Sequence, residues 1–450
     1  QGVVPVNYVR CAAIAAALAI APLSAAAAAP AIPAPSVDTV AGATVVQQLD
    51  SAASLAGVTL LVRAGLDRQT MRENGLAALV AETILRTPVE ASPGDKTTVP
   101  LEEAIAAHGG SIHFNVDPGD VRFYVEALAE DAPVVLQLLQ TAVAAPDLSP
   151  ATVRSARAAL GKQIAQSQQV ALQVGLDMLY AASAPQANTG LPELGTPASL
   201  AQLVPEDVAR FYHAYYRRGG ALVSAAGRLD SLPSGALASL ASALPAGDTT
   251  PVAVHVSPLG GAMHEIVAHR DIASPWLIAQ YSAPKVDSRD FGPMLVLAAF
   301  LRRTISDIAQ VPGVVSPTFA SRSVGADYVY DRYPSSLVLY VNGGLIANPT
   351  RAFATALSVV GVLAATPLQG SIDDFKAVAA GDFAGDATTL ESRTWLAAVF
   401  SRENASPDFI NHALAAIAAT TPADVQRVAR TYLGNPTIAL VLPRGTNLQD

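Results

Sequence analysis

The sequence predicts an α+β fold made of two similar halves. Two stretches repeat each other, one beginning at Pro205 and one at Pro422, an offset of 217 positions (422 − 205). Segments with helical spacing of apolar residues are mixed with segments in which every second residue is apolar, the pattern of strands. Charged residues make up only 14% of the chain, with 51% hydrophobic residues, against roughly 25% charged in ordinary domains. This balance predicts large buried cores.

The repeat extends beyond these two stretches. Gly75 corresponds to Gly292, and Arg86-Thr87 to Arg303-Thr304, at the same offset. A period this long indicates a duplicated domain, because solenoid repeats are roughly 20–50 residues long. We therefore expect two tandem homologous domains with a linker rich in Ser, Pro, Gly and Ala between them. The expected bounds are residues 46–230, linker 231–262 and residues 263–450.

The first residues have the pattern of an export signal. Arg10 precedes an apolar run from Cys11 to Leu23, which small residues follow. We interpret residues 1–29 as a cleaved signal peptide rather than a membrane anchor, because the run is rich in Ala and contains Pro22. Residues 30–45 are then a flexible leader. The expected location is the bacterial periplasm, and no later apolar run reaches the length of a membrane span.

In the first half, helices and strands follow one another in a definite order. A strand at Thr59–Val62 precedes a helix from Gly75 to Leu85, which Asn74 is expected to cap. A short helix leads to an antiparallel hairpin that turns at Asp117–Asp120, because apolar residues alternate on both sides of the turn. Three more helices and a closing strand follow. The remaining helices are expected to start near Asp131, Ser149 and Pro205, and the closing strand covers 221–226.

The second half repeats this order. Strands are predicted near Leu277, around Tyr328–Tyr330 and at Leu337–Val341, with a helix from Gly292 and a last strand at Ile438–Leu442. We expect the helices of each half to cover one face of a mixed sheet.

Three segments resemble the M16 metallopeptidase family, which includes pitrilysin, insulin-degrading enzyme and the mitochondrial processing peptidase. Leu194-Gly195-Thr196, continued by Ser199-Leu200 and by Pro205 to Tyr215, resembles a G-T-x-x-S-L passage with a following helix. Gly75-Leu76-Ala77 resembles the start of the family's catalytic helix, and Gly109-Gly110 the glycine before its first hairpin. The resemblance implies tandem LuxS/MPP-like metallohydrolase-type domains.

The residues that perform the family's chemistry are missing. M16 peptidases bind zinc through the two His of H-x-x-E-H, whose Glu is the general base, and through a more distant Glu. By this alignment Ala78 and Glu82 stand where the two His would be, and Ala81 where the base would be. No Asp or Glu occurs near Arg157–Gln163, where the third ligand is expected. The resemblance therefore predicts no catalytic residues, no metal site and no cofactor in this chain.

Two further groups of residues are functional candidates. Arg322 and Tyr328 resemble an R-x-x-x-G-x-x-Y pattern that binds the substrate backbone in the family, one residue short, so we predict a substrate-binding role for them. A non-standard zinc site could be formed by His108 and His113 with Glu102 and Glu103, or by Glu82 with His108 or His113, although a solvent-exposed helix end and a strand position explain the two His more simply.

The sequence therefore favours a proteolytically inactive M16-like subunit, although it does not settle whether the chain is an enzyme. Such a subunit would form a heterodimer with a catalytic subunit that carries H-x-x-E-H and zinc, or a homodimer, and would contribute to a chamber that binds peptides. An active zinc peptidase with non-standard ligands and a stand-alone scaffold of a larger complex are the alternatives. The formal charge of −9 and the absence of Lys/Arg runs argue against a nucleic-acid partner.

Overall fold

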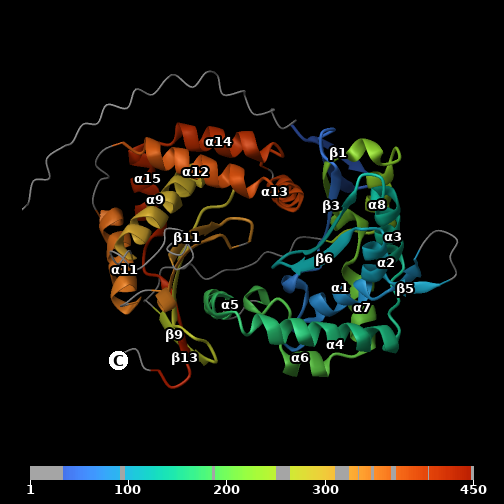
Figure 1. The fold of residues 1–450 in the computed structure, drawn as a ribbon. Coiled ribbons are helices and arrows are strands. Elements are labelled where there is room, and N and C mark those ends of the chain that lie inside the picture. The colour runs from blue at the N-terminus through green and yellow to red at the C-terminus, as the bar shows by residue number, and fades with distance from the viewer. Residues whose placement is uncertain are drawn as a thin grey trace, which may run out of the picture. The chain divides into compact units, whose positions relative to one another are not determined.

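Two β-sheets and their helices organise the fold (Figure 1). The computed structural model describes residues 34–91, 97–184, 188–249, 264–309, 324–332, 334–345, 349–365, 371–403 and 405–446. The predicted signal peptide at residues 1–29 lies outside these ranges. The mixed α+β character predicted from the sequence is confirmed. None of the described helices is both long and apolar enough to cross a membrane.

The first sheet has six strands, and all neighbouring pairs are antiparallel except β2 with β8, which run parallel. The strand β6 lies at one edge, and the exposed strand β1 lies at the other. In sheet order the strands are β1 (Ser36–Val40), β2 (Ala43–Leu49), β8 (Leu222–Gly227), β3 (Leu55–Val62), β7 (Val121–Leu128) and β6 (Ser111–Val116). A separate small ribbon pairs β4 (Pro88–Glu90) with β5 (Thr98–Pro100).

The second sheet has five strands, with β11 at one edge and β9, parallel to β13, at the other. In sheet order these are β11 (Val324–Val329), β12 (Ser336–Asn342), β10 (Trp276–Ser282), β13 (Thr437–Pro443) and β9 (His264–Arg270).

The helices fall into the same two groups. Those of the first half are α1 (Leu76–Leu85), α2 (Leu101–Ala107), α3 (Ala132–Ala144), α4 (Pro150–Ser167), α5 (Ala171–Ser183), α6 (Pro197–Gln202), α7 (Pro205–Tyr215) and α8 (Ala236–Ala243). Those of the second half are α9 (Phe291–Ala309), α11 (Pro349–Ala365), α12 (Asp373–Asp386), α13 (Leu390–Arg402), α14 (Phe409–Ala419) and α15 (Pro422–Tyr432).

Helices α7 and α15 show the repeat most directly, because both their first and their last residues are 217 positions apart (422 − 205 and 432 − 215). Each has Pro at its first position, where the missing N–H costs nothing. In each, an Asp three residues after the N-cap accepts a hydrogen bond from the N-cap backbone at 3.1 Å, Asp207 from Val204 and Asp424 from Thr421. Local capping chemistry therefore fixes both starts.

Each sheet is covered on both faces, rather than on the one face that was expected. Side chains alternate along a strand, so Val58, Leu60 and Val62 of β3 join the core formed with the helices of the first half. The opposite face of β3 and β8 packs against α13, a helix of the second half. There the hydroxyls of Thr59 and Thr394 lie 2.7 Å apart.

A helix of the first half likewise packs on the second sheet. Helix α5 of the first half packs on β13 and β10, where Leu179 and Ile278 belong to one buried cluster. Residues 171–183 of α5 shifted by 217 overlap the range of α13, so the exchanged helices occupy corresponding places in the repeat. Each half completes the core of the other.

Three local expectations differ from the structure. The leader expected at residues 30–45 contains β1 and the start of β2, because β2 gains its backbone partners from the distant strand β8. The linker expected at 231–262 contains α8, whose Leu237 and Leu240 are buried in the first core. The cap of α1 is Gly75 with φ of 91°, in the left-handed region that favours glycine, rather than Asn74.

Candidate functional site

The start of α1 packs against the distant segment that resembles the same family. A side chain added at Gly75 would meet the Leu194 carbonyl oxygen at 2.9 Å and the Gly195 Cα at 3.0 Å. Both glycines have positive φ, 91° and 82°, so neither backbone would accommodate another residue easily. The two segments that carry the sequence resemblance therefore form one structural unit around the beginning of α1.

The three degenerate motif positions are all buried on α1. Ala78 and Glu82 are four residues apart and share one face of the helix, whereas Ala81 is one position earlier. All three side chains are in the protein interior, with 1% or less of their surface exposed. The two alanine methyl groups are part of the hydrophobic core and have no atom that could bind a metal or accept a proton.

Glu82 is held by two hydrogen-bond donors, one on each carboxylate oxygen. Arg86 Nε donates to Oε1 at 2.9 Å, and Gln163 Nε2 of α4 donates to Oε2 at 3.1 Å. Arg86 also binds Glu102 of α2 at 2.6 Å. Burial raises the pKa of Glu82, and the hydrogen bonds from Arg86 and Gln163 oppose that rise. Glu82 therefore links α1 to α4 through Gln163, and Arg86 extends the network to α2 through Glu102.

Gln163 is the residue that sequence reasoning missed. It lies in the window 157–163, where the third zinc ligand of the family was expected and where no carboxylate occurs. Its amide instead donates a hydrogen bond to one oxygen of Glu82 at 3.1 Å. The sequence indicates only that Gln163 lies where the third ligand was expected. Its contact with Glu82 follows from the packing of α4 on α1 in the folded chain.

These residues do not fit a zinc ion. Catalytic zinc requires three protein ligands of the His, Cys, Asp or Glu type and one open position. In the part of the chain that the structure describes, no group of three such side chains is arranged to hold a metal. The residues at this position can bind one another and can support the helices, but they cannot supply the metal-bound water of the family reaction.

The two histidines considered as alternative ligands have other contacts. His108 Nε2 lies 3.0 Å from the Ala91 carbonyl oxygen, and its Nδ1 is 3.8 Å from Asp131. His113 Nε2 lies 2.9 Å from the Glu391 carboxylate, at the start of α13. His113 therefore contributes to the contact between the halves, and neither His has Glu82 among its partners.

Of the two residues predicted to bind substrate, only Tyr328 lies in the described part of the chain. Arg322 lies outside the described residues. Tyr328 lies on the edge strand β11 and is 7% exposed. Its hydroxyl donates to the Pro284 carbonyl, and burial raises its pKa well above the ordinary value. In this arrangement the Tyr328 hydroxyl supports the second sheet.

A cleft adjoins the degenerate motif and was not foreseen from the sequence. Its volume is about 600 Å³, and we call it the α4–α5 cleft. It is bordered by the last residues of β6, by Gln163 of α4, by Val170 and Asp177 around α5, and by residues 192–196. Burial raises the pKa of Asp177 to about 6. Because β6 is an edge strand, its outer side offers backbone groups beside this cleft.

The chain is similar in sequence and in fold to M16 proteins. The sequence model of the family Insulinase (Peptidase family M16) matches residues 44–196, the part that holds α1, β6, α4 and all of the residues lining the α4–α5 cleft except Arg270. No curated protein matches this chain in sequence.

Solved structures match nearly the whole chain at low identity. A protease from Helicobacter pylori is 13% identical, covers 92% of this chain and 100% of its own, and has a TM-score of 0.75. The peptidase M16 inactive domain from Pseudomonas fluorescens is 14% identical over 91% of this chain and 97% of its own, with a TM-score of 0.73. A chain of complex III2 from Candida albicans is 15% identical over 90% and 95%, with a TM-score of 0.68. At such identities the likeness shows the fold.

Proposed function

This chain is a degenerate member of the M16 peptidase family, and we propose that it is a non-catalytic subunit that works beside a separate subunit carrying H-x-x-E-H and zinc. The chain contributes two tandem homologous domains and part of a peptide-binding chamber. It is exported to the bacterial periplasm after removal of residues 1–29. A homodimer is the other assembly that the proposal allows.

One observation carries the loss of catalysis: Glu82 is bound on both oxygens by Arg86 and Gln163, while alanines occupy the other two motif positions. A metal ligand requires a free lone pair pointing at the metal site, and a general base requires access to a water molecule. The single acid of the motif is 1% exposed, which excludes bulk water, and its two oxygens are oriented toward Arg86 and Gln163, with no His, Cys, Asp or Glu at the other two motif positions to complete a ligand set.

The edge strand β6 supports the peptide-binding part of the proposal. An extended peptide can add to an exposed strand through backbone hydrogen bonds, which depend little on sequence. The α4–α5 cleft lies beside β6 and offers space of about 600 Å³ for side chains of such a peptide. The exposed Val170 supplies an apolar contact at its border.

The first test uses the purified full chain. We expect elemental analysis to find less than about 0.1 zinc per chain, and we expect no cleavage of a peptide library above the buffer rate. Zinc near one equivalent, together with turnover that a chelator removes, would contradict the proposal. If Glu82→Gln also removed that turnover, the active peptidase with non-standard ligands would be the correct alternative.

The second test concerns the partner. Co-purification of the tagged chain from native cells should recover a subunit of similar size with H-x-x-E-H, and the mixture should cleave peptides faster than that subunit alone. Recovery of a second copy without such a subunit would indicate the homodimer. Recovery of an unrelated membrane complex would replace the proposal by a scaffold role, which the similarity to a chain of complex III2 makes a specific second candidate.

A further inference from the structure

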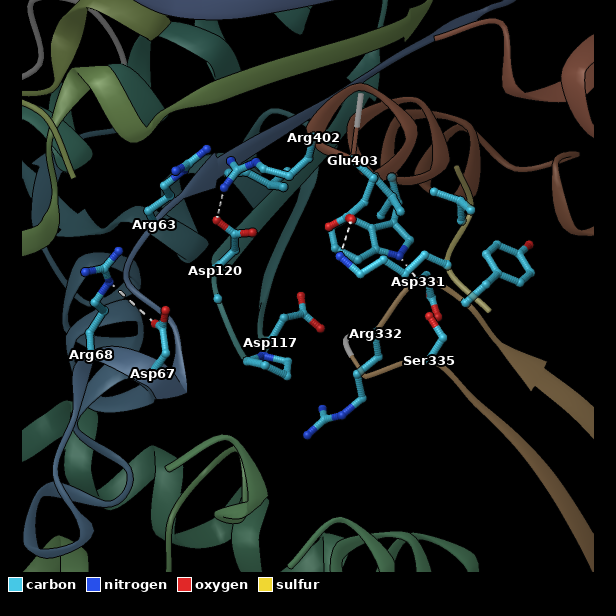
Figure 2. Close-up of a pocket in the computed structure, with 18 residues that line it drawn as sticks. Arg63, Asp67, Arg68, Asp117, Asp120, Asp331, Arg332, Ser335, Arg402 and Glu403 are labelled. Carbon is cyan, nitrogen blue, oxygen red and sulfur yellow. Dashed lines mark hydrogen bonds and ion pairs between the residues drawn. The ribbon is translucent and has the colours of Figure 1, made fainter. Parts of the chain in front are cut away.

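A second cavity, distinct from the α4–α5 cleft, lies between corresponding turns of the two halves (Figure 2). Its volume is about 470 Å³, within the range of roughly 300–1,000 Å³ of small-molecule sites. The turn between β6 and β7 borders it on one side, and the turn between β11 and β12 on another. The end of α13 closes a third side. We call it the two-turn cavity.

Most charged groups in the two-turn cavity are already paired with one another. Arg402 binds Asp120, and Lys285 lies 3.1 Å from Glu403. Asp331 accepts a hydrogen bond of 2.8 Å from the Trp395 indole. Figure 2 shows these pairs as dashed lines around the cavity. They leave little net charge to attract a simple ion.

Arg63 is the lining cation that remains, because Arg68 lies 3.5 Å from Asp67 and Arg332 pairs with Glu193. Arg63 follows β3 and borders the cavity, and it has no hydrogen bond or ion pair with any residue that the structure describes. Burial and the neighbouring Arg402 lower its pKa, while Asp120 and Asp67 oppose this less strongly. A bound carboxylate would relieve this unfavourable environment by supplying a paired negative charge.

Among the lining acids, Asp117 has neither an ion pair nor a side-chain hydrogen bond with a described residue, whereas Asp67 lies 3.5 Å from Arg68 and Asp331 accepts the hydrogen bond from Trp395. Oδ2 of Asp117 is buried and has no hydrogen-bond partner among the described residues, and Figure 2 shows this carboxylate turned into the cavity. Burial raises its pKa to about 7 although Arg122 and Arg332 oppose the shift, and Glu193 and Asp331 add to it. An ammonium group would donate the hydrogen bonds that Asp117 lacks.

Part of the cavity wall is apolar. Leu61, Val286, Trp395 and Val399 border the cavity, and Trp395 is held in place by Asp331 and by the guanidinium of Arg122, 4.3 Å from its ring centroid. Such a surface suits an aliphatic side chain, because burying it removes apolar area from water.

We propose that the two-turn cavity binds a small zwitterion, a free α-amino acid or a short peptide with an aliphatic side chain, whose carboxylate pairs with Arg63 and whose ammonium group pairs with Asp117. A simple anion would leave Asp117 without a partner, and a simple cation would leave Arg63 without one. This site is separate from the degenerate motif, and the inference does not depend on the proposed function.

The experiment is isothermal titration calorimetry of the full chain with leucine and leucyl-leucine at pH 7, below the pKa of about 7.7–8.0 of an α-amino group next to an amide. N-acetyl-leucine lacks the ammonium group and leucinamide lacks the carboxylate, so each tests one contact without changing the protein. We expect saturable 1:1 binding of at least one zwitterion and at least tenfold weaker binding of both blocked ligands. Lack of saturation by both zwitterions at about 10 mM, where even a millimolar site would be filled, would overturn the proposal. So would equal binding of a blocked ligand.

Variants locate the site. Arg63→Gln and Asp117→Asn should each weaken the zwitterion at least tenfold. Arg289→Gln and Asp374→Asn change the same residue types at exposed positions outside the cavity, and they should leave binding unchanged. Circular dichroism identifies any variant that fails to fold, in which case the blocked ligands decide. Full binding by a folded Arg63→Gln or Asp117→Asn chain would contradict the assignment.

Discussion

Thr59 of β3 and Thr394 of α13 place their hydroxyl oxygens 2.7 Å apart in the protein interior, although 335 residues separate them in the chain. Thr394 also donates to the Glu391 carbonyl at 3.0 Å, so Thr59 is left to donate to Thr394. This bond joins the first sheet to a helix of the second half. It makes the contact between the halves specific as well as apolar.

Replacing one member of this pair should cost more than replacing both. Thr394→Val leaves the buried Thr59 hydroxyl without a partner, and we expect it to lower the free energy of unfolding by about 1–2 kcal/mol. Thr59→Val with Thr394→Val removes both polar groups, so the double variant should recover part of the loss. Urea unfolding of the four chains gives the coupling energy. Strict additivity would show that the bond contributes nothing.

Gly175 should be intolerant of a side chain because α5 approaches β10 closely there. A Cβ at Gly175 would lie 2.2 Å from Ile278 Cδ1, and Ile278 is fully buried. We expect Gly175→Leu to destabilise the fold by about 1–3 kcal/mol through overpacking. Gly161 of α4 has open space around it, so Gly161→Leu should be neutral or stabilising. Thermal unfolding compares the two, and equal melting temperatures would contradict the expected close packing.

Local patterns predicted most individual elements, and contacts between distant segments account for what they missed. The start of α7 could be predicted from the sequence because Pro205 and Asp207 fix it within one turn. Strand β2 could not be predicted in this way, because its partner β8 is distant in sequence and the residues around β2 are rich in Ala and Pro. Strand propensity depends on such partners more than helix propensity does.

The sequence shows which side chains occupy the motif positions but not what those side chains contact. The sequence places Ala78, Ala81 and Glu82 at the motif positions and shows no acid near Gln163. It cannot show that Gln163 and Arg86 bind Glu82 from two directions, because α4 and α1 meet only in the folded chain. The exchange of α5 and α13 between the sheets was missed for the same reason.

Arg86 should be more important for stability than an exposed arginine with similar pairs. Arg86→Met leaves Glu82 buried without its cation, and we expect a loss of about 3 kcal/mol at pH 8. Arg210→Met removes pairs with Glu73 and Asp207 from a side chain that is 58% exposed, which should cost less than about 1 kcal/mol. Urea unfolding measures both.

The loss in Arg86→Met should also depend on pH. Burial already raises the pKa of Glu82, and removing Arg86 raises it further. An acid with a raised folded-state pKa destabilises the fold once it must ionise, so the loss should be larger at pH 8 than near 4.5. Adding Glu82→Gln should recover part of it at pH 8. A loss independent of pH would show that Arg86 acts through packing alone.

The exposed Val170 should report peptide binding in the α4–α5 cleft. Val170 is 55% exposed and borders the cleft, whereas Val378 of α12 is 47% exposed and does not. Because both valine side chains are exposed in the folded chain, the Val170→Asp and Val378→Asp variants should fold equally well. We expect only Val170→Asp to weaken binding of an unfolded apolar peptide, by about threefold to tenfold, measured by fluorescence anisotropy. Equal affinity in the two variants would place peptide binding elsewhere.

Asp117 should make the stability of the chain fall as pH rises. Its pKa is raised from 3.8 to about 7, mainly by burial, so the folded state holds a proton that the unfolded state releases. The free energy of unfolding must therefore decrease between those two pH values. Asp117→Asn removes this pH-dependent loss, so it should stabilise the chain more at pH 8 than at pH 4, whereas the exposed control Asp374→Asn should not.

Urea unfolding at both pH values measures this gain in stability. A saturating zwitterion should reduce the gain at pH 8, because its ammonium group would favour the ionised carboxylate of Asp117. A gain at pH 4 equal to that at pH 8 would mean that folding does not shift the pKa of Asp117, and the burial argument for this carboxylate would fail.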